Sequence, residues 1–128
     1  MNKPRALIVE DDSDLLTIFS EALKLDGFEI TTAHDGQMAM TRLDEAAPDV
    51  VVLDLHLPKV ADREVLKRIR TEARLANTKV IVATADARLA EELENKADLI
   101  LVKAIGFHQL SDLAQRLRPD GPQPDPKR

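Results

Sequence analysis

Residues 50–54 read Val-Val-Val-Leu-Asp, four apolar residues followed directly by an acidic one. Similar short apolar runs recur along the chain, each bounded by polar residues: Ala6 to Val9, Val80 to Ala83 and Leu99 to Val102. Runs of this length, rich in Val, Ile and Leu, are typical of strands buried on both faces of a parallel sheet. A fifth segment, residues 28–33, begins with alternating apolar and polar residues and predicts a strand at the sheet edge.

Apolar residues spaced as on one face of a helix separate and follow these strands. They form five stripes: Leu15, Ile18, Phe19, Ala22 and Leu23; Ala39, Met40, Leu43, Ala46 and Ala47; Val65, Leu66, Ile69 and Ala73; Leu89, Ala90, Leu93 and Ala97; and Leu110, Leu113, Ala114 and Leu117. Asp35-Gly36 predicts the turn and N-cap of the second helix, and Pro48 marks the entry to the third strand. We expect all five stripes to face the core.

The order is therefore strand then helix, five times over. This alternation predicts an α/β fold with a doubly wound, five-stranded parallel sheet in the order 2-1-3-4-5 and five helices, the flavodoxin-like arrangement. Ligands of such sheets bind beyond the carboxyl ends of the strands, where the winding direction reverses. In this order the reversal falls between the first and third strands, so we expect the functional site there.

Composition excludes several classes of function. The chain has 128 residues and a net charge of −5, with its 18 basic residues spread along the sequence, so we expect no nucleic acid to bind this domain. The longest apolar runs are four or five residues, far below the roughly 20 that a membrane helix needs. Cysteine is absent, which excludes disulfides and thiolate metal sites and fits a cytoplasmic location.

The chain reads as one domain with a distinct end. We expect the domain to cover residues 4–118. Residues 119–128 contain four of the seven prolines and no apolar anchor, so we predict a disordered tail or the start of a linker.

Polar residues follow the predicted strands where their carboxyl ends share one edge of the sheet. They are Glu10, Asp11 and Asp12 after the first strand, Asp54 after the third, Thr84 after the fourth and Lys103 after the fifth. Clustered carboxylates repel one another unless a cation enters, and they suit a hard, oxygen-binding ion such as Mg²⁺. A carboxylate can also attack phosphorus, with metal, hydroxyl and ammonium groups neutralising the phosphoryl oxygens.

Four segments at these strand ends resemble the signature of response regulator receiver domains, the CheY-like family. They are Val9-Glu10-Asp11-Asp12, Asp54-Leu55-His56-Leu57-Pro58, Thr84-Ala85 and Lys103, and the resemblance extends over about residues 4–118. It implies phosphorelay signalling in a two-component system, and not an enzyme. The implied partners are a histidine kinase or phosphotransfer protein as phosphoryl donor and an output protein of unknown identity.

The resemblance also implies a role for each residue. Asp54 would accept the phosphoryl group and contact Mg²⁺. Asp11 would bind Mg²⁺ directly and Glu10 through water, and the main-chain carbonyl of His56 would be the remaining protein ligand. Thr84 and Lys103 would bind the phosphoryl oxygens. Asp12 would lie one step beyond the metal ligands and help to cap the first helix.

Four features depart from the family pattern. Ala104 stands where the family usually has the proline after Lys103, and a cis bond there would cost about 2.5–4 kcal/mol. Ile100 replaces an aromatic switch residue, so ring rotation cannot be the output signal. The stretch from Thr84 to Lys103 is about three residues short, nearly one helical turn. Asp62 replaces a frequent glycine in the loop after the phosphoacceptor.

These departures leave an alternative open, a receiver-like module that binds its partner without phosphorylation. In that case Lys103 could be a structural ion-pair partner of Asp54. A third hypothesis is a Mg²⁺-dependent phosphohydrolase of the haloacid dehalogenase type. Such enzymes usually carry a second aspartate two residues after the nucleophile, where this chain has His56, which argues against that class.

Overall fold

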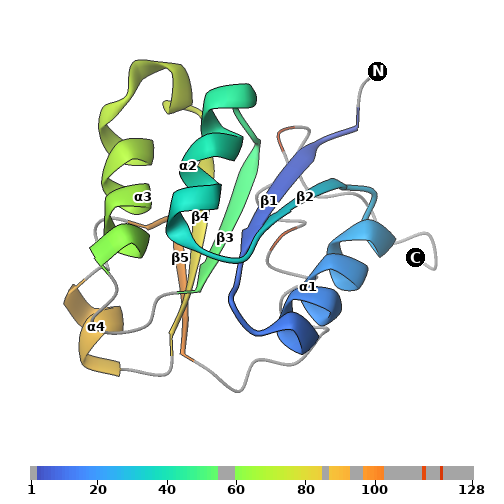
Figure 1. The fold of residues 1–128 in the computed structure, drawn as a ribbon, viewed down its shortest axis with the longest axis horizontal. Coiled ribbons are helices and arrows are strands. Elements are labelled where there is room, and N and C mark those ends of the chain that lie inside the picture. Colours follow the sequence, from blue (N-terminus) through green and yellow to red (C-terminus); the bar gives the residue numbers. More distant parts are fainter. Residues whose placement is uncertain are drawn as a thin grey trace, which may run out of the picture.

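The structure is a computed structural model and describes residues 3–54, 60–84, 87–92, 97–102, 114 and 119, with the main chain alone at 60–62, 87, 89–90 and 99–102. Its elements alternate between strand and helix along the chain (Figure 1). In order they are β1 (Arg5–Val9), α1 (Ser13–Leu25), β2 (Glu29–Ala33), α2 (Gly36–Glu45), β3 (Val50–Asp54), α3 (Val60–Thr71), the 3₁₀ helix η1 (Ala73–Leu75), β4 (Lys79–Thr84), α4 (Ala87–Glu92) and β5 (Leu99–Val102).

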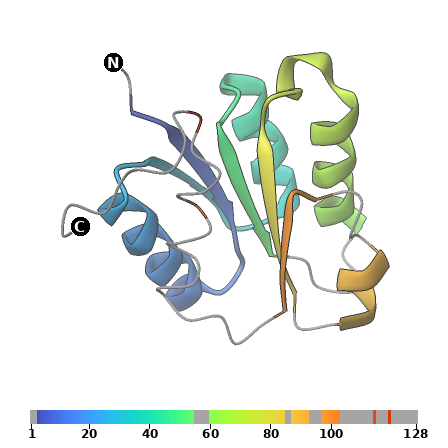
Figure 2. The same ribbon diagram turned by 180° about the vertical axis from the view of Figure 1, so that it is seen from behind.

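The five strands form one parallel sheet in the order β2-β1-β3-β4-β5. The predicted fold class and strand order are confirmed, and β2 lies at the sheet edge as its alternating sequence predicts. Helices α2 and α3 cover one face of the sheet, and α1 lies on the opposite face (Figures 1 and 2). The reversal of winding therefore falls between β1 and β3.

The core has two layers, one on each face of the sheet. Successive side chains of a strand point to opposite faces, so a strand covered on both sides must be apolar throughout. In β1, Leu7 and Val9 pack with α2 and α3, whereas Ala6 and Ile8 pack with α1. Every residue of β3 is buried. This double burial explains why the strands read as short continuous apolar runs.

Two predicted aspartates cap helices. The Asp12 carboxylate accepts hydrogen bonds from the N–H groups of Asp14 and Leu15 at the start of α1, at 2.9 and 3.1 Å. The Asp35 carboxylate accepts one from the N–H of Met38 at 2.7 Å and starts α2. Both predictions are confirmed, and each cap binds main-chain N–H groups that have no partner within the helix.

Several predicted helical residues lie outside the helices. Ala46 and Ala47 follow the end of α2, and Ala46 is extended at φ −159° and ψ 150°. Pro48 disfavours helical geometry at the residue before it, so α2 ends early. Ala73 belongs to η1 because Glu72 is extended and interrupts α3, and Ala97 lies in a bend before β5. Ala97 nevertheless packs against the α2–α3 side of the core.

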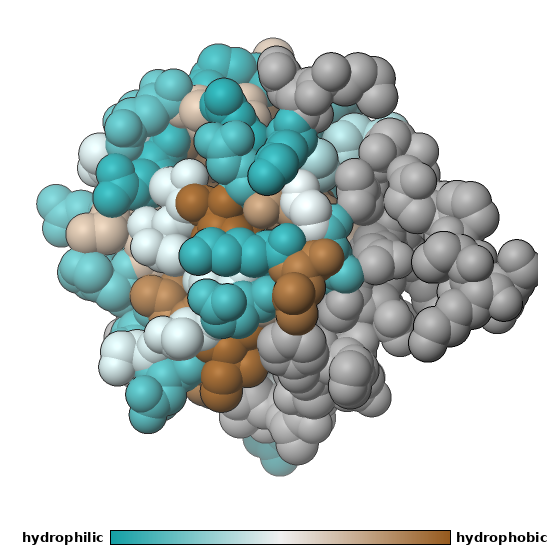
Figure 3. All heavy atoms as spheres, turned by 90° about the vertical axis from the view of Figure 1, so that its right-hand side faces the viewer, coloured by the Kyte–Doolittle hydropathy of each residue, from teal (hydrophilic) through white to brown (hydrophobic). Residues whose placement is uncertain are grey.

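One predicted core residue of α1 faces solvent. Ile18 is 44% exposed, although its spacing places it on the apolar stripe. The buried positions of α1 are Phe19, Ser20, Ala22 and Leu23. At about 100° per residue, Ile18 lies beyond one edge of that arc. Figure 3, which views the side of the molecule where α1 lies, shows apolar surface among polar residues.

Other predictions fall on residues that the structure does not describe. The fifth helical stripe is among them, except for Ala114, which is buried and packs against the α1-side core. Residues 119–128 are also outside the described part, apart from Pro119 in a turn. None of the described helices is both long enough and apolar enough to cross a membrane.

Candidate functional site

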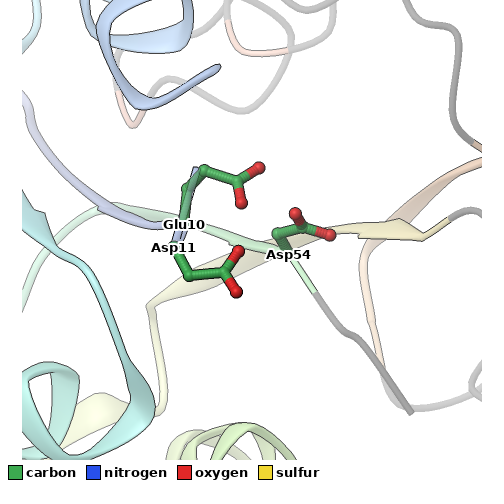
Figure 4. Close-up of side chains that lie close together, drawn as sticks. All are labelled: Glu10, Asp11 and Asp54. Carbon is green, nitrogen blue, oxygen red and sulfur yellow. The ribbon is translucent and has the colours of Figure 1, made fainter. Parts of the chain in front are cut away.

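Strands β1 and β3, which flank the point where the winding direction reverses, bring two carboxylates side by side. Val9 in β1 pairs with Leu53 in β3, so the next position along each strand is Glu10 and Asp54. Asp11 follows Glu10, and the three side chains face one another from the ends of β1 and β3 (Figure 4). Strand pairing, and not loop conformation, therefore brings Glu10 next to Asp54.

The three carboxylates form a compact acidic cluster. One ligand oxygen from each of Glu10, Asp11 and Asp54 lies within 4.8 Å of the others. Glu10 and Asp54 are each only 2% exposed, whereas Asp11 reaches solvent. Among the residues that the structure describes, this is the one group of His, Cys, Asp or Glu arranged to hold a metal ion. The group lies beyond the carboxyl ends of the strands, where the sequence predicts the site.

The electrostatics of the cluster disfavour three negative charges. The pKa of Glu10 is raised from 4.5 to about 8, chiefly by burial and also by the hydrogen bond and the charge of the neighbouring Asp54. The N–H of Asp12, 3.2 Å from Glu10 Oε2, acts in the opposite direction but does not offset it. A divalent cation among these oxygens would reverse the effect, because it favours the ionised carboxylates. Three clustered oxygen donors of this kind fit Mg²⁺.

Thr84 ends the strand next to β3, at the same end of the sheet as the cluster. It is the last residue of β4 and is buried, and Asp54 pairs with the preceding residue, Ala83. Thr84 is thus one residue beyond the neighbour of Asp54 on the adjacent strand. The structure brings Glu10, Asp11 and Asp54 together and places Thr84 at the same end of the sheet, on the adjacent strand β4.

The remaining predicted positions are only partly described. Lys103, Ala104 and His56 lie outside the described residues, so their predicted roles and the predicted bond geometry at Ala104 stay predictions. Ile100 lies in β5 opposite Val82. Asp62 lies within α3, so the prediction that it occupies a loop is wrong. Residues 93–96 are not described, and the position of the predicted shortening stays a prediction.

A sequence model of the response regulator receiver domain matches residues 6–115, which include all of the site positions above. The chain belongs to this family. The family comprises signalling domains of two-component systems, so the resemblance predicted from the strand-end motifs is confirmed.

Curated relatives include full-length regulators. The transcriptional regulatory protein PrrA of Mycobacterium leprae is 37% identical over 112 residues, which cover 86% of this chain and 48% of PrrA. The alkaline phosphatase synthesis regulatory protein PhoP of Bacillus subtilis is 36% identical over 72 residues, 56% of this chain and 30% of PhoP. This receiver domain thus spans about half the length of PrrA, and less of PhoP.

Solved structures of receiver proteins share the fold. The response regulator TrrA of Thermotoga maritima, solved in complex with Mg²⁺-BeF, matches with a TM-score of 0.78 and 30% identity over 89% of this chain and 98% of TrrA. The chemotaxis response regulator CheY4 of Vibrio cholerae matches with a TM-score of 0.81 and 25% identity, over 91% and 99% of the two chains. The CheY-like architecture is therefore shown.

One polar residue at the opposite end of the sheet, where β4 and β5 begin, was missed by the sequence reasoning. Asp98 directly precedes β5, and its carboxylate bonds to both β4 and α3. Its only signal in the sequence is an acidic residue immediately before an apolar run. Strand-end reasoning looks at the carboxyl ends of strands and therefore passes over it.

Proposed function

We propose that this receiver domain, over residues 4–118, accepts a phosphoryl group on Asp54 in a Mg²⁺-dependent reaction. The observation that carries the proposal is the cluster of Glu10, Asp11 and Asp54, in which the candidate nucleophile lies at the end of the central strand β3. Its family membership makes phosphorelay signalling the setting. A histidine kinase or phosphotransfer protein would be the natural donor.

The chemistry follows from the residues at the strand ends. A carboxylate oxygen of Asp54 forms a bond to phosphorus while the bond between phosphorus and the donor atom breaks, and the electron pair leaves with the donor. Glu10, Asp11 and Asp54 would hold Mg²⁺, together with the main-chain carbonyl of His56 assigned from the sequence. Bound there, Mg²⁺ neutralises negative charge on the phosphoryl oxygens.

The remaining residues act on the transferred group. The hydroxyl of Thr84 donates a hydrogen bond to one phosphoryl oxygen, and the ammonium group of Lys103 pairs with another. The product carries about −1.5 to −2 charges where Asp54 carried one, if it resembles other phosphorylated side chains. This added charge alters the surface that an output protein binds. It can shift the equilibrium between two conformations of the domain only if it interacts more favourably with one of them than with the other.

The output is proposed to be a change in protein binding. The relatives with this domain are transcriptional regulators by name, but this chain has a net charge of −5, which disfavours contact with DNA. The output partner is therefore another protein or protein segment. Because Ile100 is not aromatic, ring rotation at that position cannot carry the signal.

The test uses intact mass spectrometry, since the chain has no Trp or Tyr to report by fluorescence. The protein is incubated with acetyl phosphate with Mg²⁺ or with EDTA. We expect the mass of one phosphoryl group to be gained only with Mg²⁺ and lost on treatment with hydroxylamine, which cleaves acyl phosphates. Asp54→Ala should gain nothing, whereas Asp44→Asn, a change at an exposed carboxylate of α2, should behave as wild type.

A failure has a defined meaning. No gain of mass under conditions that label a control receiver protein would overturn the proposal. It would favour the alternative of a receiver-like module that binds its partner without phosphorylation. Labelling that persists in Asp54→Ala would instead move the phosphoacceptor to another residue.

A further inference from the structure

The start of β5 is held by one acidic side chain. Asp98 Oδ2 accepts a hydrogen bond from the main-chain N–H of Val80 in β4 at 2.7 Å, and another from Arg70 Nη2 of α3 at 2.6 Å. The N–H of Asp98 donates to the carbonyl of Val80 at 3.0 Å. Both main-chain polar groups of Val80 are thus bound by a single residue, where β4 and β5 run side by side (Figure 2).

The Asp98 carboxylate substitutes for a main-chain acceptor. Val80 is fully buried, and β5 begins only at Leu99, one residue after Asp98. A buried N–H needs an acceptor, and here the side chain supplies it. Burial acts to raise the pKa of Asp98, but the Arg70 guanidinium and the Val80 N–H outweigh it and hold that pKa below its ordinary value. The carboxylate is therefore ionised at neutral pH.

The sequence of β5 does little to specify its register. Its four residues read Leu-Ile-Leu-Val, so a shift by one or two positions would still present apolar residues to both faces of the sheet. The bonds of Asp98 are different, because they form only when Leu99 lies opposite Ile81 and Val102 opposite Thr84. Polar contacts at one end of the strand therefore select one register from several of similar apolar burial.

We propose that Asp98 is a positioning residue for phosphorylation, because it sets the register of β5 on β4 and so holds Val102, the residue before Lys103, opposite Thr84. Lys103 is the next residue after Val102 in the sequence. A slip by one residue would displace Val102, and with it the point from which the chain continues, by about 3.3 Å along the strand. That is more than a hydrogen bond tolerates. The inference rests on the function proposed above.

The test compares Asp98→Ala and Asp98→Asn with wild type and with Asp44→Ala. The last variant is a matched control, because it breaks a 2.6 Å ion pair between α2 and α3 without touching β5. Three quantities are measured: the phosphorylation rate with acetyl phosphate at saturating Mg²⁺, the Mg²⁺ dissociation constant by calorimetry, and hydrogen exchange of the Leu99–Val102 amides of β5. Each substitution at Asp98 is also made in a Lys103→Ala background.

We expect Asp98→Ala to be phosphorylated about 10- to 100-fold more slowly, as misplacement of a catalytic group by angstroms implies. Its Mg²⁺ dissociation constant should stay within about twofold of wild type, because the acidic cluster lies on β1 and β3. In the Lys103→Ala background the same substitution should cause no further loss of rate. Asp98→Asn, which can still accept from Val80, should fall between wild type and Asp98→Ala and serves if the alanine variant does not fold.

Three results would overturn the inference: an unchanged rate, an equal loss of rate with and without Lys103, or a loss matched by Asp44→Ala. Amide exchange tests the register without using phosphorylation. If wild type takes no phosphoryl group, the proposed function fails, and faster exchange of the Leu99–Val102 amides in Asp98→Ala still supports a register role, because these amides do not bond to the Asp98 side chain. If wild type is phosphorylated and exchange is unchanged, the positioning role alone fails.

Discussion

Replacing Glu10 by glutamine should stabilise the metal-free protein at neutral and alkaline pH. The carboxyl group is buried beside Asp54, and its pKa is raised from 4.5 to about 8. The folded chain therefore binds a proton at Glu10 more tightly than the unfolded chain does. The free energy of unfolding must then fall as the pH rises from about 4.5 to about 8, and level off above that.

The size of the effect follows from the pKa. At about 1.4 kcal/mol per pKa unit, a rise from 4.5 to about 8 corresponds to about 5 kcal/mol at pH 8. Asp11 is exposed, so water reaches the cluster and lowers this value, and we expect about 2–5 kcal/mol. A domain of this kind is typically stable by about 5–15 kcal/mol in total. The ionisation of one side chain can thus change a substantial part of the free energy of unfolding.

The assay is urea unfolding followed by far-ultraviolet circular dichroism, in EDTA, from pH 5 to pH 8.5. Wild type should lose stability across that range, whereas Glu10→Gln should be nearly flat and more stable at the upper end. Glu29→Gln, at an exposed glutamate of β2, is the matched control and should follow wild type. A wild-type curve that rises with pH, or a glutamine variant no more stable than wild type at pH 8, would refute the reasoning.

Three further substitutions are expected to lower the unfolding free energy, each measured by the same urea titration. Asp12→Ala removes the cap of α1 and should cost about 1 kcal/mol. Thr78→Val deletes the buried hydroxyl that donates to the Pro48 carbonyl at 2.7 Å, and should cost about 1–3 kcal/mol; an unchanged midpoint would show that the carbonyl finds another donor. Arg68→Met removes a guanidinium group that is only 20% exposed and that pairs with the more exposed carboxylates of Asp44 and Glu72; it should cost about 1–2 kcal/mol. Its control, Lys24→Ala in a pair exposed on both sides, should cost under about 0.5 kcal/mol. Equal losses for the last two would contradict the role given to burial.

Strands were predictable from the sequence because burial on both faces constrains every residue. The runs chosen for β1, β3 and β4 differ from the observed strands by at most one residue at each end, and that for β5 agrees with it. Helix ends were less predictable, and alanine is the reason. Alanine counts as apolar in such a stripe wherever it falls at helical spacing, so Ala46, Ala73 and Ala97 extended the predicted stripes past the true ends. The helices stop where Pro48 and the extended Glu72 interrupt them, which apolar periodicity does not register.

The acidic site was predictable for a different reason. Carboxyl ends of parallel strands share one edge, so a carboxylate after β1 and another at the end of β3 must approach each other. Their burial and the raised pKa of Glu10 were not predictable, because both depend on how the two layers of core close around the strand ends. Asp98 was missed because its role depends on two partners distant in the sequence, Val80 in β4 and Arg70 in α3, which only the folded chain brings next to it.

Glu10 and Asp54 occupy positions that would otherwise extend the core. Along β1 and β3 they continue the alternate positions of Ile8 and Val52, which pack in the layer beneath α1. Apolar side chains there would lengthen that layer, whereas two buried carboxylates make the folded metal-free state less stable. A cation that binds the cluster only in the folded chain must then stabilise that chain by mass action. The stabilisation grows with the logarithm of the cation concentration. In the proposed function, Mg²⁺ binding and folding stability are therefore linked through Glu10. The linkage has a definite direction, because the proton on Glu10 competes with the metal: lowering the pH through about 8 should weaken Mg²⁺ binding in wild type and leave Glu10→Gln much less affected.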